Sequence, residues 1–285
     1  MTRRTFIGVT MVGIERLLGG SQSDSMAPAL FCGHGSPMNI VTDNAYTRRM
    51  KEIGTLLKKP KAVLVISAHW VSDALFVSTV EHPETIYDFY GFPPSLYTIR
   101  YPASGAPEIA NSIVNKLKSF AAVADPKRGL DHGAWSVLKL LFPDADVPVF
   151  QMSLNRRFTP EQHYALGMEL SALRKEGIMI LGSGDIVHNL YQIDPDPNAL
   201  KAPWAETFEA KIKEALLDND SATLIRFKEL GNDAKLACPS DEHFLPLLYV
   251  AAATAHESID FVYEGFEHGT ISLSSFGSNL TKGVL

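Results

Sequence analysis

Residues 147–181 constrain the fold more than any other part of the chain, because they have the pattern of a strand, a helix and a second strand. The apolar runs 147–152 and 178–181 are typical of buried strands. Between them, Thr159-Pro160-Glu161-Gln162 combines an N-cap, a first-turn proline and a capping-box glutamine, and Gly177 is a typical helix end. Such a unit predicts parallel pairing of the two strands and a right-handed crossover.

The chain from residue 27 onwards continues this alternation of strands and helices. Further strands are predicted at 29–32, 62–66, 75–80, 259–265 and 270–276, and helices at 46–57, 104–120, 205–227 (with a break near 218–220) and 244–255. No linker or internal repeat divides this part of the sequence. We therefore predict a single α/β domain over residues 27–285, with a central mixed, largely parallel β-sheet flanked by helices.

Residues 1–26 are predicted to form an extension outside this domain. Thr2-Arg3-Arg4-Thr5-Phe6 resembles a twin-arginine export signal. The apolar stretch that follows is short, however, Glu15-Arg16 interrupts it, and no small-residue cleavage site follows. The extension is thus either disordered, in a protein of the cytoplasm, or a twin-arginine signal that exports the protein to the periplasm.

Charge and composition exclude several classes of protein. The net charge is −6 and Lys and Arg form no cluster, so we expect no nucleic-acid partner. No apolar run reaches the roughly 20 residues that cross a bilayer, so we expect no membrane partner. Two cysteines cannot supply a disulfide framework. The expected protein is a monomer or small homo-oligomer that acts on a small molecule.

Three histidines follow predicted strands. They are His34 in GHGSP, His69 in SAHW and His188 in DIVHN. Because the carboxyl ends of parallel strands meet at one edge of a sheet, these imidazoles can converge on one zinc or iron ion there. The alternative is that each is an ordinary hydrogen-bonded surface or cap residue.

Two further histidines lie in segments rich in apolar residues. His243 and its neighbour Glu242 point about 100° apart if their segment is helical, so only one of them can face the site. His243 shares a helical face with Leu247 and Val250, which favours the histidine. His132, within LDHGAW, is expected on a loop before a helix, where it is free to contact a substrate.

Five motifs together resemble a known family. GHGSPMN around His34, SAHW around His69, DHGAW around His132, DIVHNL around His188 and EHFLPLLYV around His243 resemble the class III extradiol ring-opening dioxygenases, which are LigB-like proteins. Within that family the resemblance is to the 4,5-DOPA dioxygenase extradiol branch. It spans about residues 27–277, with the motifs in order.

The resemblance implies a role for each of these histidines. His34 and His69 match the two metal-ligand histidines of the family. His243 matches a further histidine near the metal, where the related protocatechuate enzymes use a carboxylate, so Glu242 stays the alternative third ligand. His188 matches an acid/base histidine that can itself approach the metal. His132 matches a histidine on the substrate side of the site.

The activity that the resemblance implies is extradiol opening of a catechol ring. The substrate is a DOPA-like aromatic diol, the co-substrate is O2, and the product is of the muconate-semialdehyde type. Turnover is expected to need Fe(II) at a non-haem site, which Zn(II) can also occupy. Two alternatives stay open: a zinc-dependent hydrolase, and a non-catalytic metal- or ligand-binding module of the same fold.

A long Pro/Gly/aromatic stretch covers residues 85–102 and carries five aromatic side chains between Tyr87 and Tyr97. Long loops in a folded domain are often functional, so this stretch is a candidate lid over the substrate ring. Alternatively, its aromatic side chains pack against the sheet. The remaining histidines are expected to be surface or structural residues: His82, His163, His256 and His268.

Overall fold

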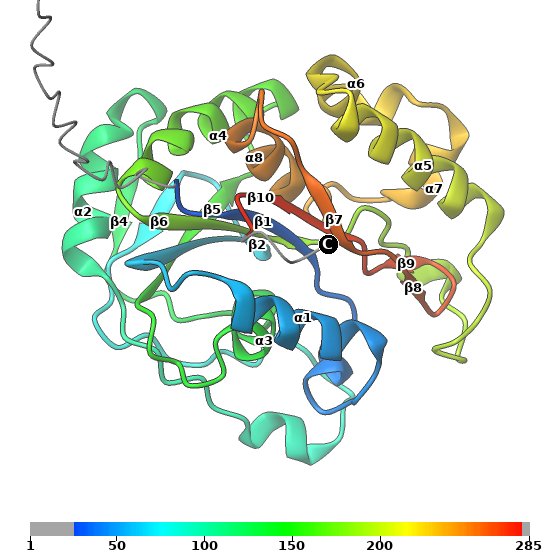
Figure 1. Ribbon diagram of the computed structural model, residues 1–285, viewed down its shortest axis with the longest axis horizontal. Coiled ribbons are helices and arrows are strands. Elements are labelled where there is room, and N and C mark those ends of the chain that lie inside the picture. Colours follow the sequence, from blue (N-terminus) through cyan, green and yellow to red (C-terminus); the bar gives the residue numbers. More distant parts are fainter. Residues whose placement is uncertain (1–25, 281–285) are drawn as a thin grey trace, which may run out of the picture.

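One mixed sheet runs through the computed structural model, which describes residues 26–280 (Figure 1). Four neighbouring strands are parallel, and strands on both sides of them include antiparallel pairings. This is the mixed, largely parallel sheet that the sequence predicts. In spatial order its strands are β4 (Val123–Asp125), β3 (Phe76–Ser78), β5 (Val149–Asn155), β2 (Ala62–Ser72), β6 (Ile178–Gly184), β1 (Ala29–Gly33), β10 (Ser275–Ser278) and β7 (Asp260–Tyr263).

The strand–helix–strand unit consists of β5, α4 (Pro160–Lys175) and β6. Thr159 and Gln162 form the predicted capping box, and Gly177 ends the unit's helical part with a φ of 87°. The predicted direct pairing of the two strands is wrong, because β2 lies between them and is parallel to both. The strand–helix–strand pattern predicts that the two strands run in the same direction, but not that they are neighbours. The continuous apolar run of β2 suits a strand in the middle of the sheet, which is covered on both faces.

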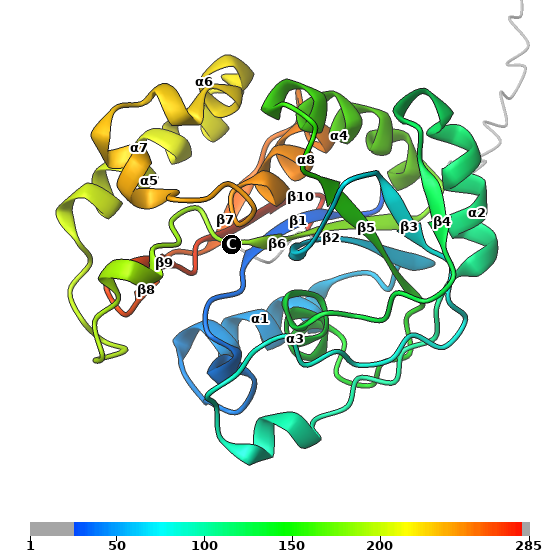
Figure 2. The same ribbon diagram turned by 180° about the vertical axis from the view of Figure 1, so that it is seen from behind.

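Alternate side chains of β2 enter the two hydrophobic cores. Ala62, Leu64 and Ile66 pack in one core, and Val63 and Val65 pack in the other. The first core lies under α2 (Pro107–Lys116), α4, α5 (Pro203–Leu217) and α8 (Leu245–Ala253), and the second lies under α1 (Ala45–Leu56) and α3 (His132–Leu141). Figures 1 and 2 show these layers on opposite sides of the sheet.

Several boundaries differ from the predicted ones. β2 extends to Ser72 and its register with β5 shifts between Ile66 and Val71. The predicted helix 205–227 breaks at residues 218–220 as expected, giving α5 and α6 (Ser221–Ile225), and the predicted last strand divides into β9 (Ile271–Ser272) and β10. The sequence reasoning missed β4 and the short elements α7 (Asn232–Ala237) and β8 (Phe266–Glu267).

The predicted extension 1–26 lies outside the described residues except for Met26. Within residues 26–280, no helix has the length and hydropathy that crossing a bilayer requires.

Arg174 joins α4 to the ends of two other elements. Its buried guanidinium donates to the carbonyl oxygens of Ala27 and Ala253 and to the carboxylate of Glu257. Burial alone would raise the pKa of Glu257, but hydrogen bonds from Arg174 and Ser278 and the Arg174 charge outweigh it and lower the pKa. The contact therefore stabilises the fold above the unfolded-state carboxyl pKa of about 4.3.

Replacing Glu257 with Gln is expected to lower the free energy of unfolding at pH 7 by about 1–2 kcal/mol, because a charged hydrogen-bond acceptor is lost from a partly exposed position. Because the folded-state pKa is the lower one, the difference from wild type should fade as the pH drops through it. Urea titrations of both proteins at pH 7 and pH 3 measure the loss of stability and its decrease at low pH. Glu176→Gln, which breaks an exposed pair with Lys116, is the matched control and should cost less than about 0.5 kcal/mol.

Candidate metal centre

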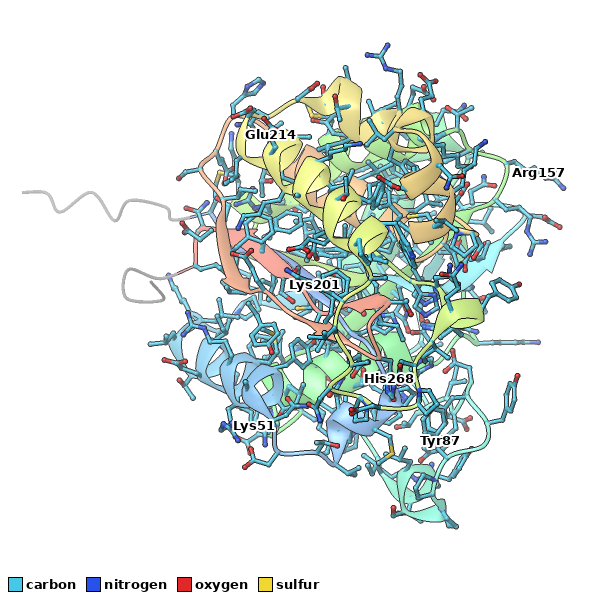
Figure 3. The ribbon with its side chains drawn as sticks, turned by 90° about the vertical axis from the view of Figure 1, so that its right-hand side faces the viewer. Lys51, Tyr87, Arg157, Lys201, Glu214 and His268 are labelled. Atoms are coloured by element: carbon cyan, nitrogen blue, oxygen red, sulfur yellow. The ribbon has the colours of Figure 1, made fainter. Side chains whose placement is uncertain are left out.

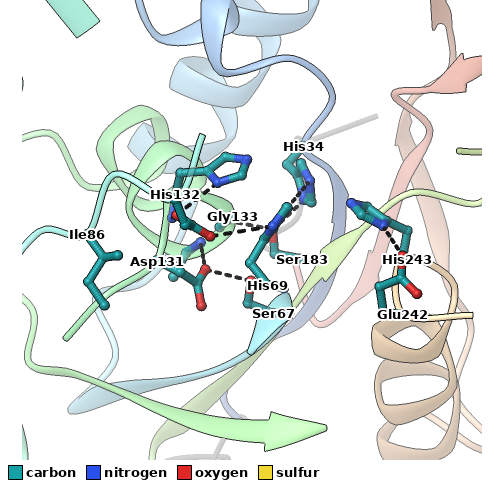
Figure 4. A network of polar contacts seen from close by, with 12 residues as sticks. His34, Ser67, His69, Ile86, Asp131, His132, Gly133, Ser183, Glu242 and His243 are labelled. Atoms are coloured by element: carbon teal, nitrogen blue, oxygen red, sulfur yellow. Dashed lines mark hydrogen bonds and ion pairs between the residues drawn. The ribbon is translucent and has the colours of Figure 1, made fainter. Parts of the chain in front are cut away.

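The carboxyl ends of three neighbouring strands, β2, β6 and β1, bring the predicted histidines to one edge of the sheet. His34 directly follows β1, His69 lies in the last part of β2, and His188 follows β6. His69 falls where the register of β2 shifts, which is the kind of irregularity that redirects a side chain. In Figure 4, the rings of His34, His69 and His243 point toward one another.

His34, His69 and His243 form a group with the dimensions of a metal site. One ligand atom from each lies within 4.8 Å of the other two. The Nε2 atoms of His34 and His69 are 3.2 Å apart. Two nitrogens bound to one zinc at about 2.0–2.1 Å lie roughly 3.3 Å apart at a tetrahedral angle. His243 Nε2 is buried without a hydrogen-bond partner among the described residues, as expected of an atom that binds a metal.

The other ring nitrogen of each histidine faces an oxygen that can fix the tautomer. The Ser183 hydroxyl donates to the Gly133 carbonyl at 2.6 Å, so it accepts from His34 Nδ1 at 3.0 Å. His243 Nδ1 lies 3.3 Å from Glu242 Oε1, and His69 Nδ1 lies 3.5 Å from Asp88 Oδ2. With the proton on Nδ1, each Nε2 keeps a lone pair for a metal.

Burial keeps these imidazoles neutral. It lowers the pKa of His34 and His243 well below the usual value, and the charges of neighbouring histidines lower it further. For His69, burial and the neighbouring His132 lower the pKa to about 4. A neutral imidazole is the form that binds a metal. None of the three histidines therefore has to lose a proton before it binds a metal at pH 7.

The alternative third ligand, Glu242, lies outside the three-histidine group. Glu242 and His243 lie in a turn before α8, and not in a helix. His243 is buried, while the Glu242 side chain is one-third exposed and also accepts a hydrogen bond from Ser240. The Glu242 carboxylate is thus placed to accept a hydrogen bond from the Nδ1–H group of His243.

His132 differs from its predicted setting. It is the first residue of α3, not a loop residue, because Asp131 caps the helix by accepting from Ala134 N. The residue is buried, and the centroid of its ring lies 3.9 Å from that of His69. Both its backbone N–H and its Nδ1 lie within 3.0 Å of Asp88 Oδ1.

Asp88 is a site residue that the sequence reasoning missed. Burial alone would raise its pKa, but hydrogen bonds and charge from His132 outweigh this and lower the pKa to about 2. Asp88 therefore stays charged and holds the His132 ring with Nε2 free. One acidic residue within an aromatic loop carries no signal of this role in a single sequence.

Replacing Asp88 with Ala is expected to lower kcat about 10–100-fold, the usual effect of losing a partner that orients a site histidine. Asp88→Asn should lose less, since its amide oxygen can still accept from the His132 backbone N–H. The ratio of kcat values for the two variants, measured at equal metal content, tests this. Equal kcat values for wild type and Asp88→Ala would contradict the orienting role.

His188 lies beside the three-histidine group and not within it. Its ring stacks on His243 with centroids 3.5 Å apart and planes inclined by 5°. Its ligand atom groups with His243 and Asp185, but not with His34 and His69. Burial lowers its pKa to about 4. Its assignment as a metal ligand stays a prediction.

Asp185 is a buried carboxylate at the same edge. Its Oδ1 accepts from Gly35 N at 3.0 Å, and Gly35 has a φ of 57° that favours glycine. Its Oδ2 lies 3.7 Å from His34 Nε2 and has no hydrogen-bond partner among the described residues. Burial raises its pKa well above the usual value. A divalent ion on the histidines would supply the missing countercharge.

A cavity of about 530 Å³ opens over the histidines. Phe89, Tyr90 and Phe92 line it, so part of the stretch 85–102 covers the site as the lid prediction requires. Tyr87 instead packs against Trp135 of α3. His268, expected to be a surface or structural residue, also lines the cavity, and Figure 3 shows it on the same face of the protein as Tyr87.

The comparisons with known proteins agree with this geometry. Residues 29–277 match the family model of the catalytic LigB subunit of aromatic ring-opening dioxygenase. The chain belongs to the LigB family. It is 40% identical to a 4,5-DOPA dioxygenase extradiol of Escherichia coli (strain K12), over 89% of this chain and 95% of that protein. It is 38% identical to a 4,5-DOPA dioxygenase extradiol of Beta vulgaris, over 89% of this chain and 97% of that protein.

The LigB-family fold is also seen in a solved structure. The crystal structure of an uncharacterized protein from Escherichia coli K12 matches with a TM-score of 0.77 at 36% identity, covering 88% of this chain and 99% of that one. The predicted family, fold class and enzyme class are thus confirmed. This LigB protein is an extradiol ring-cleavage dioxygenase, which implies a non-haem metal, an aromatic substrate and O2. This assignment replaces the two alternatives, a zinc-dependent hydrolase and a non-catalytic binding module.

Proposed function

We propose that the protein opens the ring of a catechol beside its two hydroxyl groups, using O2 and an Fe(II) ion held by His34, His69 and His243. The product is then of the muconate-semialdehyde type. The single observation that carries the proposal is the group of three inward-facing imidazoles, with the His243 Nε2 atom buried and unpaired. Neutral imidazoles with open coordination positions suit Fe(II).

The metal, when bound, supplies chelation of the two catechol oxygens and the electron transfer that O2 activation needs. The protein supplies three Nε2 lone pairs, and the other ring nitrogens of these histidines face oxygens of Ser183, Glu242 and Asp88. The buried Asp185 carboxyl group lies beside His34, with Oδ2 3.7 Å from His34 Nε2. These contacts set the positions of the ligands before the substrate enters, so little reorganisation is needed on binding.

Two further histidines line the cavity and are assigned to proton transfer. His188 is held by its stack on His243, and a neutral imidazole there can take a proton from a catechol hydroxyl. His132 is oriented by Asp88 and presents Nε2 as a second acid/base group. The ring of Phe89 meets that of His132 edge-on, with the ring centroids 5.4 Å apart.

Reconstitution with Fe(II) under nitrogen, followed by a panel of catechols that includes L-DOPA in air, tests the proposal. Oxygen consumption equal to the catechol consumed, with a yellow semialdehyde product, is the expected result. Zinc-loaded protein should consume no oxygen, because Zn(II) has no redox chemistry. Iron bound at the site with no oxygen uptake on any catechol would reject the proposal.

A further inference from the structure

We infer that the preferred catechol carries a neutral, apolar ring substituent instead of a carboxylate, and in this it differs from the DOPA-like substrate with an amino-acid side chain that the sequence resemblance implies. This inference rests on the proposed function, because it takes the histidine group as the place where the two hydroxyl oxygens bind. The substituent then extends from the ring toward the outer part of the cavity, away from the metal ligands.

Apart from the histidines, most residues that line the cavity are apolar. No lysine or arginine among residues 26–280 lines it. The polar lining comes from the histidines, Asp88 and Ser36. The apolar lining side chains come from four separate parts of the chain: Pro37 after β1, Phe89, Tyr90 and Phe92 from the loop, Leu190 and Ile193 after β6, and Ile271 of β9.

A substrate carboxylate would meet negative charge in this cavity. Asp88 is the one carboxylate among the described residues that line it, and it stays ionised beside His132. Two buried carboxyl groups, whose pKa burial raises, lie behind the loop after β1, where Asp185 accepts from Gly35 N and Glu267 from Ser36 N. These backbone N–H groups are therefore not free for an anionic ligand. A buried carboxylate without a partner is strongly disfavoured.

Apolar side chains are also exposed at the mouth of the cavity. Tyr90 is 92% exposed, Leu190 56% and Ile193 40%. Exposed apolar side chains that gather at one place indicate a surface that an apolar ligand or partner covers. The volume of about 530 Å³ lies within the usual range of roughly 300–1,000 Å³ for sites that bind drug-sized ligands, so a substituent larger than the ring's own hydroxyls fits.

The test compares three catechols that share a three-carbon chain para to one hydroxyl. They are 4-propylcatechol, 3-(3,4-dihydroxyphenyl)propionate and L-DOPA. Calorimetric titration of the Fe(II)-loaded protein under nitrogen gives each Kd without turnover. We expect 4-propylcatechol to bind at least about tenfold tighter than either acid. Equal or tighter binding of the acids would overturn the inference.

A positive charge added to the mouth should weaken this preference. Leu190→Arg supplies the cation that the cavity lacks, so the ratio of Kd values for the propionate and 4-propylcatechol should fall at least about tenfold. Tyr191→Arg is the matched control, because Tyr191 is the next residue, is 90% exposed and does not line the cavity. The same fall in both variants, or in neither, would contradict the placement of the substituent beside Leu190.

Admitting air to the same samples separates this inference from the proposed function. If the Kd order holds but no catechol is opened, the proposed function fails while the ligand preference stands. If catechols are opened and the acids have the higher kcat/KM and the lower Kd, the proposed function stands and the inference fails.

Discussion

Replacing His34 or His69 with alanine is expected to weaken metal binding by at least about a hundredfold and to abolish ring opening. Each variant removes one of three inward-facing nitrogens, and the loss of a residue that merely orients a ligand already costs about 10–100-fold. Competition against a chromophoric chelator measures the affinity, and metal analysis after gel filtration measures the occupancy.

The control for both variants is His82→Ala, which removes an exposed histidine outside the cavity. It should keep wild-type affinity and activity. The alanine variants should also keep a cooperative unfolding transition, because their side chains lie at the edge of the sheet beyond both cores. Wild-type metal affinity in folded His34→Ala would rule out the three-histidine site.

Replacing His188 or His132 with Gln is expected to lower kcat by about 10²–10⁴-fold while the bound metal is retained. This is the usual size of a general acid–base contribution. Both residues line the cavity, but neither belongs to the group formed by His34, His69 and His243. Single-turnover kinetics at equal iron content, together with the Kd for a catechol under nitrogen, separate catalysis from binding.

The two outcomes for His188 have different meanings. Loss of kcat with unchanged chelator competition supports proton transfer. Loss of metal from His188→Gln, to the extent expected for His34→Ala, would instead make His188 a ligand. A kcat within twofold of wild type in both variants would contradict the proton-transfer assignment.

The sequence predicts the fold well where patterns are local. The capping box at Thr159, the apolar run of β2 and the break after α5 all depend on neighbouring residues, and the structure confirms each. The order of strands depends on packing between distant segments. The apolar run of β2 therefore indicates a central strand, but no local pattern shows that its neighbours are β5 and β6.

The sequence predicts those site residues that lie at the ends of strands. His34 and His69 follow or end strands at one edge of the sheet, so their convergence follows from the parallel topology. His243 comes from the turn before α8, and its choice over Glu242 rests on which side chain is buried. Asp88 and His268 reach the cavity from loops, whose path a single sequence does not define.

Mass analysis of the product formed under ¹⁸O2 tests the central claim most directly. If the Fe(II)-loaded protein opens a catechol as a dioxygenase, the product should carry two ¹⁸O atoms, apart from any exchange of the aldehyde oxygen with water. His34→Ala should give no such product. A product without ¹⁸O, such as an ortho-quinone formed by two-electron oxidation, would contradict ring opening at this site.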